Sequence, residues 1–138
     1  MAEKLIKSKK RVRDFGEVYT PDHIVKDTCN LVPEDAWTIE STFLEPCCGN
    51  GNFLAEILKR KLDMCRNEKD GLKALASIVG IDILADNCEE SRKRMMALFL
   101  EKFPEANEVT VLLAAGILQN NIICGNSLEI MKLWEEKR

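Results

Sequence analysis

The chain has 138 residues, of which 46% are hydrophobic and 31% are charged, a composition typical of one globular domain with one modest core. No apolar run approaches the roughly 20 residues of a membrane-spanning helix. The basic start is not followed by the apolar stretch of a signal peptide, so we expect a cytoplasmic protein without membrane contact.

The six cysteines are irregularly spaced and include the adjacent pair Cys47 and Cys48. No C-x-x-C occurs, and the single histidine, His23, is remote from the cysteines in sequence. This pattern predicts reduced, partly buried cysteines and no metal site.

The net charge of −3 is unevenly distributed along the chain. Residues 1–14 carry six basic side chains against two acidic ones, which gives +4 and leaves −7 for the remainder. We interpret residues 1–15 as a basic N-terminal arm, disordered or locally helical, and residues 16–138 as a partial cofactor-binding domain. The arm either contacts nucleic-acid phosphates or is a solvated terminus.

A helix is predicted to begin at Thr20, a favourable N-cap, with Pro21 at the first helical position. Pro33 lies at its end. Between them, residues at helical spacing form an apolar stripe: Ile24, Val25, Thr28, Leu31 and Val32.

Three short strands are predicted, at residues 42–46, 77–83 and 121–124. The second is nearly continuous in apolar character, as expected of a strand covered on both faces. Helices are predicted at 52–65, 71–76, 85–103 and 106–119, with a polar break at 66–70 and a last helix from about Ser127. This alternation predicts an α/β fold with parallel strands and flanking helices.

Polar residues follow each predicted strand, where ligands bind in open parallel sheets. The first strand leads into a turn containing Gly49 and Gly51, which would allow a ligand to lie against the backbone. Asp82 ends the second strand, and its carboxylate could accept hydrogen bonds from a ribose diol. Asn126 follows the third strand and could meet an adenine edge. Together these residues predict a nucleoside-cofactor site.

The turn favours S-adenosylmethionine (SAM) over a dinucleotide or a nucleoside triphosphate. It lacks the third glycine of G-x-G-x-x-G, and Asp82 lies 31 residues beyond Gly51, farther than a dinucleotide site requires. No G-K-[ST] is present. Glu45 would repel a pyrophosphate but could pair with the ammonium group of SAM.

Four segments resemble the motifs of N6-adenine DNA methyltransferases. Residues 45–54, E-P-C-C-G-N-G-N-F-L, are similar to motif I of that family, and residues 16–25, G-E-V-Y-T-P-D-H-I-V, resemble its motif X. Residues 80–83 resemble motif II and residues 122–128 motif III, where an Asp often replaces Asn126. The order of these segments, with motif X before motif I, is that of type I modification subunits and type IIG enzymes of restriction–modification systems. The resemblance implies a Rossmann-like SAM-dependent methyltransferase fold, incomplete here.

The resemblance also implies residue roles. Residues 19–21 would hold the methionine end of SAM, and residues of the 45–53 loop would line the methionine pocket. Asp82 would bind the ribose, Ile83 would pack on the adenine, and Asn126 would hydrogen-bond its amino group. The candidate cofactor-binding residues are Tyr19, Thr20, Pro21, Glu45, Pro46, Cys47, Gly49, Gly51, Asn52, Phe53, Asp82, Ile83, Asn126, Ser127 and Leu128.

The catalytic Asn/Asp-Pro-Pro-Tyr/Phe motif of the family, which stacks the flipped base, does not occur in the chain. We therefore assign no catalytic residue, and expect either a fragment of a longer enzyme or a truncation that has lost catalysis. The first strand would then be an exposed sheet edge, covered by dimerisation or by the N-terminal segment.

Two alternatives remain open from the sequence. One is a non-catalytic SAM-binding or interaction module, such as a subunit that docks onto a partner. The other is a methyltransferase that acts on RNA or protein. The expected partners of the full enzyme are DNA and a specificity or restriction subunit.

Overall fold

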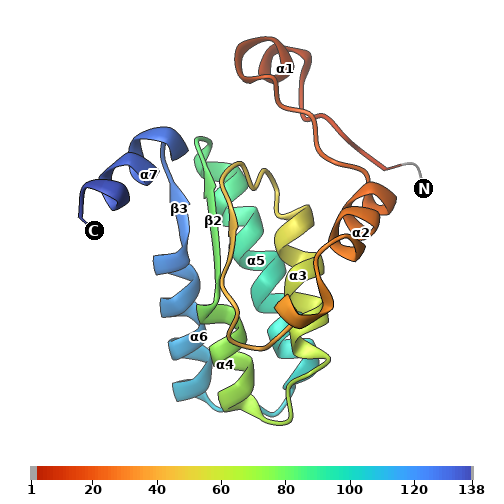
Figure 1. Cartoon of the computed structure of the whole chain (residues 1–138), viewed down its shortest axis with the longest axis vertical. Helices are drawn as coiled ribbons and strands as arrows, with labels where there is room; N and C mark the ends of the chain where they lie inside the picture. Colours follow the sequence, from red (N-terminus) through yellow and green to blue (C-terminus); the bar gives the residue numbers. More distant parts are fainter. Residues whose placement is uncertain (1–2, 138) are drawn as a thin grey trace.

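A computed structural model describes residues 3–137 as an α/β fold built on a small parallel sheet (Figure 1). The sheet has the order β1-β2-β3, with β1 at Phe43–Glu45, β2 at Ile78–Asp82 and β3 at Ile122–Cys124. All neighbouring strands are parallel. The predicted α/β class and the three predicted strands are confirmed, whereas the finer methyltransferase fold stays a prediction.

Four helices lie along the sheet and beneath it (Figure 1). The first, α3 (Asn52–Leu62), packs beside α5 (Ala85–Lys102), and both contact β2. Below them, α4 (Glu68–Ala76) packs against α6 (Glu108–Asn121). A Cβ at Gly80 would lie 2.8 Å from Leu54, so β2 and α3 approach closely where this glycine lies.

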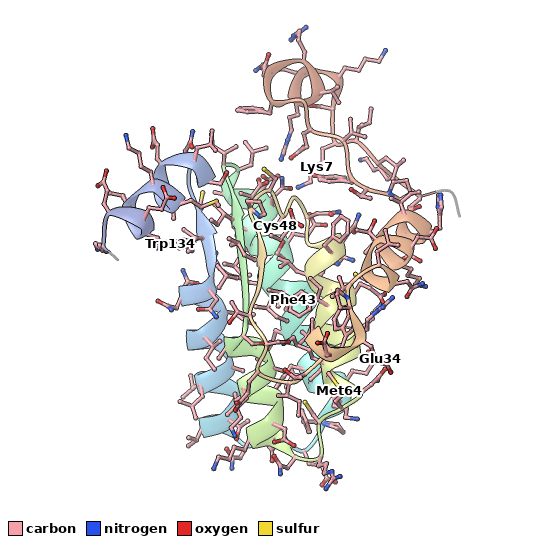
Figure 2. All side chains as sticks on the ribbon, viewed as in Figure 1. Lys7, Glu34, Phe43, Cys48, Met64 and Trp134 are labelled. Atoms are coloured by element: carbon pink, nitrogen blue, oxygen red, sulfur yellow. The ribbon has the colours of Figure 1, made fainter. Side chains whose placement is uncertain are left out.

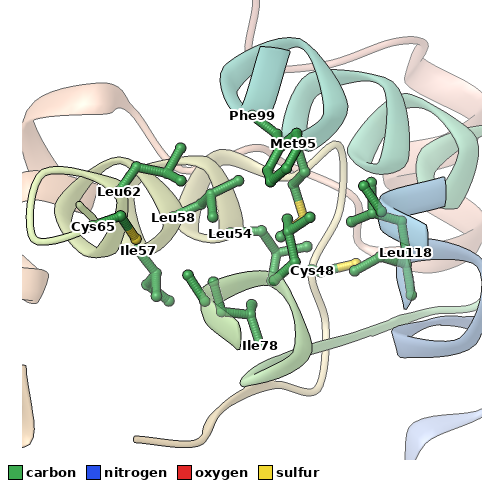
Figure 3. Packing of buried hydrophobic residues seen from close by; sticks show 14 of the residues in the cluster. Cys48, Leu54, Ile57, Leu58, Leu62, Cys65, Ile78, Met95, Phe99 and Leu118 are labelled. Atoms are coloured by element: carbon green, nitrogen blue, oxygen red, sulfur yellow. The ribbon is translucent and has the colours of Figure 1, made fainter. Parts of the chain in front are cut away.

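The hydrophobic core fills the space between these helices and one face of the sheet (Figure 3). Its apolar side chains come from α2 (Asp22–Asn30), α3, α4, α5, α6 and the strands, as the predicted helical stripes require. The largest fully buried apolar residues are Val25, Leu54, Leu58, Leu75, Ile78, Ile81, Met95, Phe99 and Ile122.

The opposite face of the sheet is unevenly covered, because Ile81 on it is fully buried whereas Leu44 is exposed. Register places Leu44 beside Val79, and Ile81 beside Ile123, on this face. The last helix, α7 (Ser127–Glu136), leaves a groove of about 390 Å³ beside Leu44, which is 41% exposed.

The edge strand β1 has one side without a partner strand among residues 3–137. No backbone hydrogen bond joins the described residues of the N-terminal arm to β1, and Lys7 and Arg11 of the arm pair with Asp86 of α5. Dimerisation through this edge stays a prediction, which sedimentation analysis of the purified chain can check.

The arm contains a short helix, α1 (Lys9–Phe15), as the expectation of local helicity allowed. Residues 1–2 of the arm lie outside the described residues. The next helix, α2 (Asp22–Asn30), is followed by a 3-10 turn, η1 (Glu34–Ala36). None of the helices described here is both long and apolar enough to cross a membrane.

The predicted start of α2 at Thr20 was wrong. The N-cap is Pro21, whose φ of −59° and ψ of 149° are extended, so the helix begins at Asp22. Pro21 has no side-chain donor or acceptor, and the Glu3 carboxylate accepts a hydrogen bond from the Asp22 amide at 2.7 Å. A carboxylate from 19 residues away thus meets a free amide of this helix.

The predicted polar break at 66–70 was also wrong, because α4 already begins at Glu68. Asn67 caps it by accepting from the Asp70 amide at 2.8 Å, and Asp70 accepts from the Arg66 amide at 3.0 Å. This reciprocal pair resembles a capping box. The preceding helix α3 ends at Leu62, three residues before the predicted end at Cys65.

Two helical glycines provide a matched test of packing. A Cβ at Gly71 would lie 2.4 Å from Phe103 and 2.9 Å from Phe99, whereas a Cβ at Gly116 would meet nothing within 4 Å. Gly71→Ala should therefore lower the free energy of unfolding by about 1–3 kcal/mol through overpacking. Gly116→Ala should raise it by about 0.5–1 kcal/mol through helix propensity. Urea denaturation measures both, and shifts of the same sign would contradict the packing described.

Candidate functional site

The carboxyl ends of the three strands open into one cavity of about 400 Å³. Three walls come from the turn after β1, the residues after β2 and the turn before α7. The fourth wall is the chain between α1 and α2. The cavity is lined by Phe15, Gly16, Glu17, Val18, Tyr19, Pro46, Cys47, Gly49, Asp82, Ile83, Leu84, Gly125, Asn126, Ser127 and Leu128.

Part of the predicted cofactor set lines this cavity. Its lining includes Tyr19, Pro46, Cys47, Gly49, Asp82, Ile83, Asn126, Ser127 and Leu128. The other candidates lie outside the lining: Thr20, Pro21, Glu45, Gly51, Asn52 and Phe53. No ligand is present to test either group, so all the assigned roles stay predictions.

The Asp82 carboxylate is held in place by the surrounding backbone and by α5. Its Oδ1 accepts from the Gly49 amide at 3.1 Å, and its Oδ2 accepts from the Leu84 amide at 3.0 Å and from Asn87 Nδ2 at 3.1 Å. Since each carboxylate oxygen has about two acceptor positions, Oδ2 is fully used and Oδ1 retains one for a ligand.

The two glycines of the turn have different surroundings. Both have positive φ, 54° at Gly49 and 94° at Gly51. A side chain at Gly49 would press on the Tyr19 ring at 3.3 Å, inside the cavity wall. At Gly51 a Cβ would lie 2.8 Å from Ser91 of α5, so this glycine allows α3 and α5 to pack closely.

Asn52 joins the turn to two other segments. Its Nδ2 donates to the Thr20 carbonyl at 2.9 Å, and its Oδ1 accepts from Arg94 at 2.8 Å. Thr20 and Asn52 thus support the cavity wall from behind, while Phe53 packs against the core.

Glu45 ends β1 next to the cavity. Burial raises the pKa of its carboxyl group, which accepts a hydrogen bond from the Cys47 amide at 3.3 Å. The carboxylate forms no ion pair within the part of the chain that the structure describes. A nearby cationic ligand would stabilise its ionised form.

Asn126 caps α7, which limits how it can meet a ligand. Its Oδ1 accepts from the amides of Leu128 at 3.0 Å and Glu129 at 3.2 Å. The side-chain Nδ2 of Asn126 is therefore the group available to a ligand, and it is a hydrogen-bond donor. Such a donor suits a ring nitrogen of adenine, whereas the predicted contact with the adenine amino group would need an acceptor.

The N-terminal arm is fastened to the start of α5 by ion pairs. Arg11 lies 2.6 Å from Asp86, and Lys7 lies 2.8 Å from Asp86 and 3.3 Å from Glu90. Figure 2 shows Lys7 where the arm meets the rest of the chain. Arg11, then Lys7, hold the pKa of the Asp86 carboxyl group well below its ordinary value. Two of the basic side chains of the arm, Lys7 and Arg11, are therefore engaged by acids of α5.

Sequence reasoning missed the cavity-lining residues Phe15, Gly16, Glu17, Val18, Leu84 and Gly125. It also missed Asn87, which is fully buried and hydrogen-bonds to Asp82, Glu17 and Tyr19. Residues 16–18 stand directly before Tyr19 in the segment that resembles motif X, and this position was the available signal. No local pattern marks Asn87, because its partners Glu17 and Tyr19 lie far away in the sequence.

Part of the chain is similar to a known protein. The chain is 39% identical over 83 residues to the type II methyltransferase M.VspI of Vibrio sp. (strain 343). The match covers 60% of this chain and 17% of that protein. No family model matches the chain, and no solved structure matches it significantly. Part of the chain is thus related to a methyltransferase.

Proposed function

We propose that this chain is the SAM-binding part of a DNA adenine-N6 methyltransferase. The observation that carries the proposal is the cavity at the three strand ends, where Asp82 and the Gly49 turn meet the segment that resembles motif X. The partial identity to a type II methyltransferase supports the same class.

The chemistry of the cavity fits a ligand with an apolar and a polar half. Its volume of about 400 Å³ falls within the range of small-molecule sites, about 300–1,000 Å³. Phe15, Val18, Ile83 and Leu128 each expose more than half of their surface around it, as apolar walls that an adenine ring would cover. Asp82 provides an acidic group for hydroxyl or cationic groups.

In this proposal, bound SAM supplies an electrophilic methyl group on its sulfonium sulfur. The residues of this chain bind and orient the cofactor: Asp82 accepts a ribose hydroxyl through Oδ1, and Glu45 stabilises the ammonium end. The full enzyme would transfer the methyl group to the amino nitrogen of an adenine flipped from the duplex. DNA and a specificity or restriction subunit are its proposed partners.

Thermal unfolding in the presence of cofactors tests the binding step. SAM and its demethylated product should raise the melting temperature, because a ligand that binds only the folded state stabilises it. NAD should have no effect. If neither SAM nor its product shifts the melting temperature at millimolar concentration, the proposal fails.

A substitution in α7 locates the site. Leu128 lines the cavity and is 79% exposed, whereas Leu133 is 55% exposed on the same helix and lies outside the lining. Leu128→Arg should weaken SAM binding at least about tenfold by placing a bulky cation in the site of a cationic ligand, a loss of about 1.4 kcal/mol. Leu133→Arg should bind SAM like the parent, as measured by isothermal titration calorimetry. Equal affinity in both variants would place the ligand elsewhere.

Thiol modification tests independently whether SAM binds in this cavity. Cys47 and Cys124 are exposed, and only Cys47 lines the cavity. Burial raises the pKa of Cys48 to about 12 and of Cys88 to about 11, which keeps these thiols protonated and unreactive. Iodoacetamide near neutral pH should therefore modify Cys47 and Cys124 alone among these four. SAM should slow the reaction of Cys47 but not of Cys124, as followed by mass spectrometry; equal protection of both would argue against the assigned cavity.

A further inference from the structure

Two cysteines that are distant in the sequence lie close together where β2 and β3 end. Cys124 is the last residue of β3 and the register partner of Asp82, the last residue of β2. Cys88 lies in the first turn of α5 and is fully buried. Both are free thiols, and the proposed function gives neither of them a role.

The alternation of side chains along β3 places both thiols on the same face of the sheet. Successive side chains of a strand point to opposite faces, so Cys124 points to the same face as Ile122. Ile122 belongs to the hydrophobic core, and Cys88 of α5 belongs to the same core. The two cysteines therefore lie at the contact between α5 and β3.

The Cys88 sulfur lies against the backbone on both sides of Cys124. It is 3.6 Å from the Ile123 carbonyl oxygen and 3.5 Å from the Asp82 carbonyl oxygen. The Asp82 carbonyl accepts a hydrogen bond from the Gly125 amide at 2.9 Å. Disulfides join residues with closely spaced backbones, whose Cα atoms are less than about 7 Å apart. The Cys88 thiol, packed between the residues that flank Cys124, is placed for such a bond.

The two thiols differ in their access to solvent and in their acidity. Cys124 is exposed and can meet a reagent, whereas Cys88 has no exposed surface. Burial, and then the neighbouring Cys124 thiol, raise the pKa of Cys88 to about 11, while Arg92 of α5 acts in the opposite direction. Once the Cys124 sulfur is part of a disulfide it carries no charge, so its contribution to the pKa of Cys88 is removed.

We infer that Cys88 and Cys124 are a redox-active dithiol, which a small-molecule disulfide converts into an internal disulfide between α5 and β3. The reaction has two exchange steps. The Cys124 thiolate attacks the reagent, forms a mixed disulfide and releases one reagent thiol. Cys88 then attacks the Cys124 sulfur, forms the internal disulfide and releases the second reagent thiol. The two hydrogens of the dithiol leave with these two thiols, so the dithiol is oxidised and the reagent is reduced.

The internal disulfide joins two parts of the chain that build the cavity. Cys124 directly precedes Gly125 and Asn126, which line it, and Cys88 directly follows Asn87, which accepts from the Tyr19 hydroxyl. The bond also closes residues 88–124 into a loop, which restricts the unfolded chain and stabilises the folded one. No cofactor takes part, so the inference is independent of the proposed function.

Oxidised glutathione tests the inference. The reduced chain is incubated with it near neutral pH, and its peptides are then mapped by mass spectrometry without reduction. Peptides joined through Cys88 and Cys124 should be at least about tenfold more abundant than the mixed disulfide at Cys124, because the second step is intramolecular. Cys47 is the internal control, since it is also exposed. It should stop at the mixed disulfide, because a bond to the adjacent Cys48 would distort the backbone.

Two serine variants separate the pair from the other thiols. Cys124 donates to the Ile83 carbonyl and Cys65 donates to the Lys61 carbonyl, and a serine hydroxyl can make either hydrogen bond. Oxidation should raise the melting temperature of the parent and of Cys65→Ser by about 5–10 °C, and dithiothreitol should reverse the increase. Cys124→Ser should show no such increase and should retain Cys88 as a free thiol.

Two outcomes would overturn the inference. One is a parent in which Cys124 remains a mixed disulfide with glutathione while Cys88 remains a thiol. The other is an internal disulfide that joins a different pair of cysteines. Neither outcome bears on SAM binding, which the thermal unfolding experiment tests separately.

Discussion

Replacing Lys61 with methionine should lower the free energy of unfolding by about 3 kcal/mol. Lys61 is fully buried, and its ammonium group lies 2.9 Å from the Thr38 carbonyl, 3.1 Å from the Ile39 carbonyl and 2.9 Å from Ser77 Oγ. It also donates to Ser41 and lies 5.0 Å from the centre of the Phe43 ring. Methionine fills the space but leaves these oxygens without a donor.

Lys59→Met is the control, because Lys59 is exposed on the same helix and its replacement should change stability by less than about 0.5 kcal/mol. Urea denaturation near pH 7 measures both variants, and a loss at Lys61 no greater than at Lys59 would contradict the described role.

The same side chain predicts a pH dependence. Burial lowers the pKa of Lys61 from 10.5 to about 8. Between these values the unfolded chain binds more protons than the folded one, so this group makes the free energy of unfolding rise with pH. The difference in stability between the parent and Lys61→Met should therefore grow from about pH 8 to 10.5.

The sheet was predictable because each strand is a short apolar run with polar or turn residues at both ends. Helix starts were harder to predict. At α2, Thr20 and Pro21 had the right chemistry for a cap and a first residue, but Pro21 is extended and the helix begins one residue later. At α4, charged residues suggested a break, although Asn67 and Asp70 were in place to cap a helix.

The candidate site was predictable where a single strand end determined the position of a side chain. Asp82 ends β2 and lines the cavity for that reason. Glu17 and Asn87 could not be predicted, since their hydrogen bond joins residues 70 positions apart. Nothing in the local sequence tells a buried asparagine of α5 from an exposed one.

The position of the arm follows from the same long-range contacts. In the sequence, residues 1–14 form a basic stretch. This composition suggested either a contact with nucleic-acid phosphates or a solvated terminus. In the folded chain, Lys7 and Arg11 pair with acids of α5 and hold residues 15–19 over the strand ends. Contact between the other basic residues of the arm and DNA stays a prediction.

Replacing Asn87 with aspartate should both destabilise the fold and release the arm. The change keeps the shape of the side chain but turns the donating Nδ2 into an oxygen that faces the carboxylates of Glu17 and Asp82. Two buried hydrogen bonds are lost and two repulsive contacts replace them. We expect the free energy of unfolding to fall by about 2–4 kcal/mol. Trypsin should cleave after the basic residues 7–13 much faster than in the parent.

Asn107→Asp is the matched control, because Asn107 caps α6 by accepting from the Thr110 amide at 2.9 Å, which aspartate does equally well. Adding Glu17→Gln to the Asn87→Asp variant should restore part of the lost stability and slow cleavage of the arm, because the new amide can donate to the carboxylate introduced at position 87. A general loss of packing would not respond to this second substitution. If Asn87→Asp has the same free energy of unfolding and the same rate of cleavage as Asn107→Asp, Asn87 does not join the N-terminal segment to Asp82.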